Sequence, residues 1–220
     1  MKKSIFLSIV AAIAVAMTFV SCGSKEEVKD TIEPITGTDY SLVTTAKGEL
    51  GIKKGEEFIV NPSSNYKAIE AIGGMFLAKT EGGYSLLDLE NGQEKVSGDT
   101  IIWKDGFFEA PKGELFIVYI PECDLRFAAN EYAVKENNAL AAFNGKITVY
   151  LDGKEALPAT GDFKKIALVG DQLYLFAKAW GKGTIKNGAV VPGKSLTAKE
   201  LKAFQAKKGF DKKATVMILE

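Results

Sequence analysis

The chain has 220 residues, and its 28 basic and 28 acidic side chains balance to a net charge of zero. It contains no histidine, which excludes Ser-His-Asp and Cys-His catalytic centres and imidazole metal sites. Arg126 is the only arginine, so the chain lacks both the arginine forks and the basic surplus typical of nucleic-acid-binding proteins, and no nucleic-acid partner is expected.

The N-terminus has the pattern of an export signal, which we predict to span residues 1–21. Lys2 and Lys3 form a basic start, and an almost wholly apolar run follows over residues 5–20. A permanent membrane helix is the alternative. However, the run is shorter than the ~20 apolar residues that a membrane span needs, and acidic rather than basic residues follow it. We therefore expect a signal that is cleaved.

The end of the apolar run, Phe19-Val20-Ser21-Cys22, resembles the cleavage box of bacterial lipoproteins, although leucine is commoner at the position of Phe19. The resemblance implies cleavage between Ser21 and Cys22 and attachment of acyl chains to Cys22, which would anchor the protein to a membrane. Each buried lipid methylene contributes ~0.8 kcal/mol, so more than one acyl chain gives a stable anchor where a single chain would not.

A polar stretch follows the cysteine. Its segment Ser24-Lys25-Glu26-Glu27 resembles the acidic export tag of Bacteroidetes surface lipoproteins; the alternative is a plain polar spacer. We expect an outer-membrane lipoprotein displayed on the cell surface, with the periplasmic face as the alternative location. Residues 22–38 are predicted to form a lipidated flexible tether, and residues 39–220 a single domain. Loss of residues 1–21 removes two lysines and no acid, which leaves a net charge of about −2.

One pattern recurs five times in the predicted domain, at residues 42–52, 76–87, 107–117, 140–149 and 173–183. Each copy carries an apolar anchor residue just past a predicted turn. The anchors, spaced by 34, 31, 32 and 33 residues, are Leu50, Tyr84, Leu115, Ile147 and Trp180. Most of the turns contain glycine, and Asn144-Gly145 is a strong hairpin signal because both positions tolerate positive φ. Each copy is therefore predicted to form a β-hairpin.

Further short strands flank these hairpins. Residues 66–72 and 163–169 share an apolar pattern upstream of two of them, and a short apolar segment follows most copies. Units of about three strands with this period are too small to be stable alone, so they must stack. The pattern resembles the WG-repeat family, whose Trp-Gly pair is literal at Trp180-Gly181 and altered at Leu50-Gly51. The resemblance implies a β-repeat fold and no single activity. We predict an all-β fold, either a propeller-like ring or a stacked sheet array.

The C-terminal end departs from the repeat. Thr197 and Glu200 have the spacing of a capping box, which predicts one helix, and Gly209 is expected to stop it as a C′ glycine. Residues 214–219 have the pattern of a final strand. We expect this strand to pair near the first unit and to close or cap the array.

Three residues are candidate ligand contacts. Trp103 and Asp105 adjoin a polar turn, and Tyr150 offers an aromatic platform for a sugar or a peptide. Trp180, at a repeat anchor, is expected to lie in the core instead. Cys123, the only thiol left after lipidation, is interpreted as a partly buried residue of a strand.

Acidic residues at predicted strand ends are interpreted as turn formers; they are Asp88, Asp99, Asp105 and Asp162. None has the spacing of a calcium loop, and we predict no metal, cofactor or catalytic residue. We favour a non-enzymatic binding or protein-interaction role at the cell envelope, with a protein or glycan ligand. A carboxylate-dependent glycan hydrolase and a structural subunit of an outer-membrane complex are the alternatives.

Overall fold

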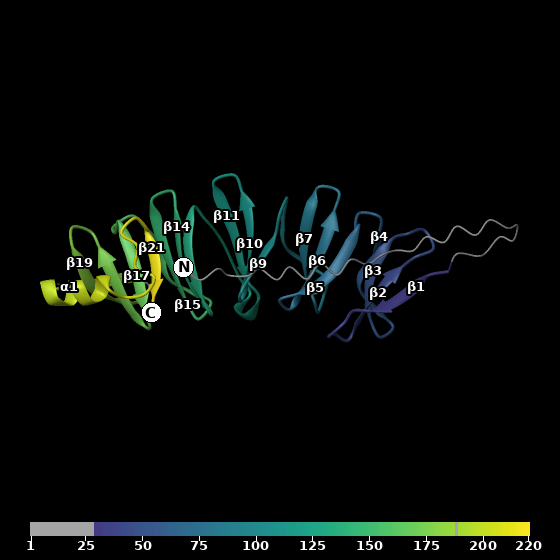
Figure 1. Ribbon diagram of the computed structural model, residues 1–220, viewed down its shortest axis with the longest axis horizontal. Coiled ribbons are helices and arrows are strands. Elements are labelled where there is room, and N and C mark those ends of the chain that lie inside the picture. The colour runs from purple at the N-terminus through teal and green to yellow at the C-terminus, as the bar shows by residue number, and fades with distance from the viewer. Residues whose placement is uncertain (1–28, 188) are drawn as a thin grey trace, which may run out of the picture.

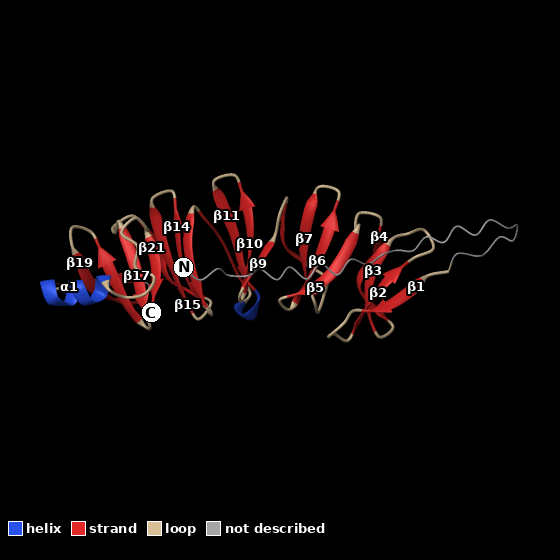
Figure 2. Cartoon of the chain, in the orientation of Figure 1, coloured by secondary structure: helices blue, strands red, loops and turns tan. Residues whose placement is uncertain are grey.

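The computed structural model describes residues 29–187 and 189–220. The predicted signal, the cleavage site at Ser21 and Cys22, and the export tag lie outside the described residues. The described chain folds into five β-sheets that stand in a row (Figure 1), with one α-helix near the C-terminal end (Figure 2). The predicted all-β repeat fold is confirmed.

We number the sheets 1 to 5 in chain order; each contains four antiparallel strands that are consecutive in the sequence. Sheet 1 consists of β1 (Thr31–Pro34), β2 (Tyr40–Thr44), β3 (Leu50–Lys54) and β4 (Glu57–Ser63). Sheet 2 consists of β5 (Ala68–Ile72), β6 (Met75–Thr80), β7 (Gly83–Asp88) and β8 (Glu94–Gly98). Sheet 3 consists of β9 (Ile102–Lys104), β10 (Phe107–Lys112), β11 (Leu115–Ile120) and β12 (Leu125–Ala129), with the 3-10 turn η1 (Pro121–Cys123) before β12.

Two sheets complete the row. Sheet 4 consists of β13 (Glu131–Lys135), β14 (Asn138–Phe143), β15 (Lys146–Leu151) and β16 (Lys154–Thr160). Sheet 5 consists of β17 (Lys165–Val169), β18 (Gln172–Phe176), β19 (Trp180–Lys186) and β20 (Ala189–Ser195). The helix α1 (Ala198–Gln205) follows, and the last strand, β21 (Val216–Leu219), returns to sheet 5 as its fifth strand.

The five predicted hairpins are all present, each as the two central strands of a sheet. They are β2–β3, β6–β7, β10–β11, β14–β15 and β18–β19. The turn between β14 and β15 behaves as its sequence predicts, because Asn144 and Gly145 have φ angles of 50° and 75°. The repeat pattern of the sequence therefore marks the middle of each sheet.

Each unit has four strands, not the predicted three or so, because the first strand of several sheets carries little sequence signal. All four residues of β1 are exposed, and β9 is only three residues long. β1 falls within the predicted 22–38 tether, yet it pairs with β2, with Ile32 opposite Val43. Sheet 1 thus extends into the predicted tether as far as Thr31.

Successive sheets pack face to face through buried apolar side chains. Because neighbouring residues of a strand point to opposite faces, one strand serves two interfaces. In β6, Phe76 and Ala78 pack against sheet 1, whereas Met75 and Leu77 pack against sheet 3. The three inner sheets are covered on both faces in this way, which explains unbroken apolar runs such as that of residues 75–78.

Helix α1 covers the outer face of sheet 5. Phe204 of the helix is buried against Trp180, with ring centroids 4.9 Å apart. The prediction that Trp180 is a core residue is confirmed, although a helix covers it and not a second sheet. The helix thus closes the apolar face at this end of the row.

The predicted capping box of α1 is confirmed. The Thr197 N–H donates to Glu200 Oε2 over 2.8 Å, and Thr197 Oγ1 accepts from the Glu200 N–H over 3.4 Å. The expected stop at Gly209 is wrong: the helix ends at Gln205 with Ala206 as its C-cap. Gly209 belongs to the next turn, in which the Phe210 N–H donates to the Lys207 carbonyl.

The last strand does not pair near the first unit, so that prediction is wrong. β21 lies parallel to β17, with Val216 opposite Ile166 and Leu219 opposite Val169. Sheets 1 and 5 stand at opposite ends of the row, and the array is open (Figure 1). The reason is local: α1 packs on sheet 5, and the segment that follows it supplies a strand to β17, an edge of that same sheet.

We predict that Phe76→Ala lowers the free energy of unfolding by about 3–5 kcal/mol, because a fully buried aromatic side chain is lost from the interface between sheets 1 and 2. Phe76 makes an edge contact with Tyr40 of sheet 1 at 5.1 Å. Urea unfolding followed by circular dichroism measures the loss. Phe143→Ala is the control, since Phe143 is 41% exposed, and equal losses for the two variants would contradict the stacking role.

Candidate functional site

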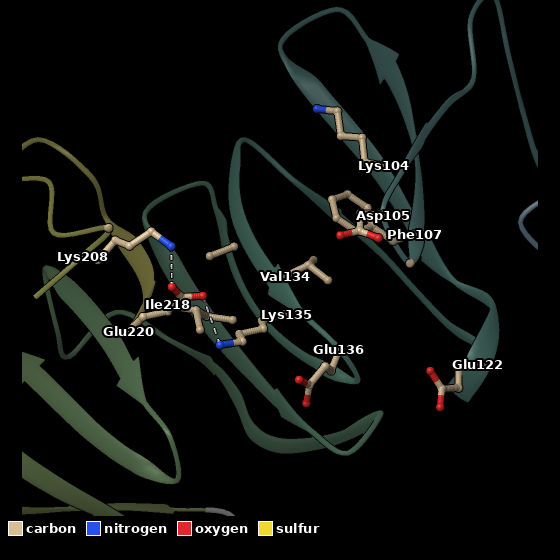
Figure 3. Close-up of a pocket in the computed structure, with 13 residues that line it drawn as sticks. Lys104, Asp105, Phe107, Glu122, Val134, Lys135, Glu136, Lys208, Ile218 and Glu220 are labelled. Carbon is tan, nitrogen blue, oxygen red and sulfur yellow. Dashed lines mark hydrogen bonds and ion pairs between the residues drawn. The ribbon is translucent and has the colours of Figure 1, made fainter. Parts of the chain in front are cut away.

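A groove of about 780 Å³ lies where sheets 3 and 4 meet the C-terminal segment (Figure 3). One wall is the turn between β9 and β10 (104–107) together with Glu122 of η1. The opposite wall is the end of β13, residues 133–136. The C-terminal segment completes the lining with residues on either side of β21, chiefly Lys208 and Glu220. Three parts of the chain that are distant in sequence therefore form this site.

The lysines that line the groove are each paired with a carboxylate. Glu220 binds Lys208 over 2.6 Å and Lys135 over 3.3 Å (Figure 3). The hydrogen bond from Lys208, and then that from Lys135, lower the pKa of Glu220. Lys104 binds Glu109 over 2.8 Å. Each lining lysine thus has a carboxylate partner within the protein, although Lys135 and Lys208 share Glu220.

The remaining carboxylates of the groove have no such partner. Among the residues that the structure describes, Asp105, Glu122 and Glu136 form no ion pair within 4.0 Å. Asp105 and Glu122 lie on the side of sheet 3, and Glu136 lies on the side of sheet 4 (Figure 3). The groove therefore presents unneutralised negative charge next to the apolar side chains of Val134 and Ile218.

Beneath one side of the groove, Glu109 joins sheets 3 and 4. Its side chain is 5% exposed, and it accepts hydrogen bonds from Lys104 and from the Tyr132 hydroxyl. A buried carboxylate is costly unless it is paired and hydrogen-bonded, so these two donors hold the wall in place. Glu109 is not among the residues predicted from the sequence, where its only signal is a lone acid inside the apolar run of β10.

Of the three predicted contact residues, Asp105 lines the groove and the other two do not. The Trp103 ring packs between sheets 2 and 3, 4.7 Å from the Phe108 ring and directly over Gly73, where an added Cβ would lie 2.5 Å from it. Tyr150 stacks on Phe127 at 5.2 Å, between sheets 3 and 4. Both aromatic residues serve packing between sheets.

Cys123 lies in η1, not in a strand as predicted. It is partly buried against sheet 4, where a Cβ added to Gly153 would lie 2.4 Å from the Cys123 Cβ. Burial and then the charge of Glu122 raise the pKa of the Cys123 thiol, which disfavours the reactive thiolate. The residue therefore packs two sheets together.

A second charged cluster links sheets 2 and 3 away from the groove. Asp124 accepts hydrogen bonds from Lys95 and from the Tyr119 hydroxyl, each over 2.8 Å, and Lys95 lies 3.7 Å from Asp88. The bonds from Lys95 and Tyr119 lower the pKa of Asp124. Asp88 also accepts from the backbone of the following turn, as its turn-forming interpretation predicts. We interpret this cluster as structural.

Within residues 29–187 and 189–220, no group of three or more His, Cys, Asp or Glu side chains is arranged to hold a metal ion. The α-helix of this part of the chain is too short and too polar to cross a membrane.

No family model and no curated protein matches the chain. Among solved structures, it is similar to Kluyveromyces lactis Hsv2 with a TM-score of 0.30 and 12% identity, over 72% of this chain and 62% of that one. It is similar to Citrobacter koseri AztD with a TM-score of 0.28 and 15% identity, over 76% of this chain and 63% of that one.

A third similar structure is PorZ, described as a bacterial surface component of the type-IX secretion system of Porphyromonas gingivalis. Its TM-score is 0.25 at 9% identity, over 70% of this chain and 25% of that one. Of the first structure named, Hsv2, this chain spans about three fifths of the length. At these TM-scores the likenesses carry no argument about function.

We predict that Tyr132→Phe lowers the free energy of unfolding by about 1.5–3 kcal/mol, the usual worth of a hydrogen bond to a charged group, because it removes one of the two donors to buried Glu109. Tyr150→Phe is the matched control. Its ring also packs on Phe127, but its hydroxyl makes no hydrogen bond within the described part of the chain. Urea unfolding measures the free energy of unfolding of both variants. An equal loss in the two would contradict the role of the hydrogen bond to Glu109.

Proposed function

We propose that the protein is a cell-envelope lipoprotein whose open row of sheets is a non-enzymatic binding module, with its site in the groove between sheets 3 and 4. The observation that carries the proposal is the groove itself, in which Asp105, Glu122 and Glu136 form no ion pair with any described residue while every lining lysine forms one. Unneutralised carboxylates beside apolar side chains suit the binding of another molecule.

The exposed apolar residues of the surface do not offer a rival site. The large ones are Ile32, Phe58, Ile102, Phe143 and Val191, and they belong to four different sheets. Single exposed apolar residues are ordinary on protein surfaces and need no partner. The binding role therefore rests on the groove and not on an apolar patch.

The proposed lipid anchor suits this arrangement. The described chain begins beside sheet 1, so an acylated Cys22 would hold that end of the row nearest the outer membrane. The groove lies two sheets further along, and stacked sheets are spaced by about 10 Å. The site would thus lie about 20 Å along the row from the anchored end, within reach of molecules at the cell surface or, in the alternative location, in the periplasm.

A photo-crosslinking amino acid at position 105, introduced in intact cells, is expected to give a discrete adduct with a binding partner. The matched control is the same probe at position 112, because Asp105 and Lys112 are both exposed and lie at opposite ends of β10. Adducts of equal yield at both positions, or none at position 105, would contradict the groove as the binding site.

The same experiment tests the anchor. In a Cys22→Ala background we expect the chain and its adduct to leave the membrane fraction, since the acyl chains would have no attachment site. Retention of this variant in the membrane pellet would remove the lipoprotein part of the proposal while leaving the groove in place.

A further inference from the structure

One edge of sheet 4 borders the groove, and this edge is formed by β13. β13 is the end strand of its sheet and pairs only with β14 among the described strands. Its residues 133–135 line the groove, and no backbone hydrogen bond outside the sheet involves them in the described chain. Such an edge presents free N–H and C=O groups to whatever lies beside it.

The protein already fills the equivalent edge of the next sheet. In sheet 5, β21 is added beyond β17, so that sheet has five strands where the others have four. β21 is held near β13 without pairing to it: Glu131 accepts the N–H groups of Thr215 over 2.5 Å and of Val216 over 3.2 Å. The free part of β13 is therefore its second half, which opens into the groove.

Resting on the proposed function, we propose that the groove binds an extended peptide segment of a partner protein, which adds as a fifth strand to the free edge of β13. Strand addition supplies affinity through main-chain hydrogen bonds and specificity through alternate side chains. The free half of β13, residues 133–135, sets the position of the core of such a segment.

The charges of the groove define the chemistry of this peptide. Side chains of an added strand would alternate between the side of sheet 3, where Asp105 and Glu122 lie, and the side of Ile218. Glu136 adds a third carboxylate at the end of β13. The complementary sequence alternates lysine or arginine with aliphatic residues.

The test uses a fluorescent peptide of alternating lysine and valine and the mature chain, with binding followed by anisotropy. We expect this peptide to bind, with affinity that falls as salt is added, and a peptide of alternating glutamate and valine not to bind. N-methylation of every second peptide nitrogen, on the edge that would face β13, should weaken binding about tenfold or more, because it removes the main-chain donors.

Matched variants test whether the peptide binds the acids of the groove or acidic residues anywhere on the surface. The triple change Asp105→Asn, Glu122→Gln and Glu136→Gln should weaken binding about tenfold or more. The control triple should leave binding unchanged; it consists of exposed acids outside the groove lining that form no ion pair in the described part of the chain, Glu90→Gln, Glu114→Gln and Asp171→Asn. Hydrogen exchange should slow at residues 133–135 when the peptide is bound.

Three outcomes would overturn the inference: no binding of the basic peptide, equal binding of the acidic or N-methylated peptide, or equal loss in the two triple variants. If the probe at position 105 still captures a partner while the basic peptide does not bind, the ligand class is wrong and the proposed function stands. If the probe captures nothing as well, both proposals fail.

Discussion

The packing of apolar side chains between the faces of successive sheets is the interaction on which the rest of the structure depends. Each of the three inner sheets has two apolar faces, and neither can be buried without a neighbouring sheet. Phe76 and Ala78 on one face of β6, and Met75 and Leu77 on the other, show how one strand joins three sheets. Stacking sets the order of the row, and the groove exists because the edges of sheets 3 and 4 and the C-terminal segment meet beside it.

Much of the fold could be predicted from the sequence, because the central hairpins carry strong local signals. The turn at Asn144 and Gly145 and the capping box at Thr197 need only a few neighbouring residues. The first strands could not be predicted in the same way, since β1 is wholly exposed and has no apolar alternation. The strand with which β21 pairs could not be predicted either. It depends on where α1 packs and not on the residues of β21 itself.

The candidate site was predictable only in part. The polar turn at Asp105 predicts a contact residue, and Asp105 does line the groove. The aromatic rings of Trp103 and Tyr150 also suggest contact residues, but in a stacked array such rings fill the spaces between sheets. Glu122, Glu136 and the free edge of β13 come together only through the stacking of sheets 3 and 4, which no local pattern reveals.

The most direct test of the central claim, that the sheets form an open row, is a distance between its two ends. Nitroxide labels at Lys47→Cys and Lys178→Cys, with Cys22 and Cys123 replaced by serine, would sit on the exposed central turns of sheets 1 and 5. Pulsed electron spin resonance should give a separation of about 40 Å, which is four inter-sheet spacings. In a closed ring sheets 1 and 5 would be neighbours about 10 Å apart, so a separation below about 20 Å would contradict the open row.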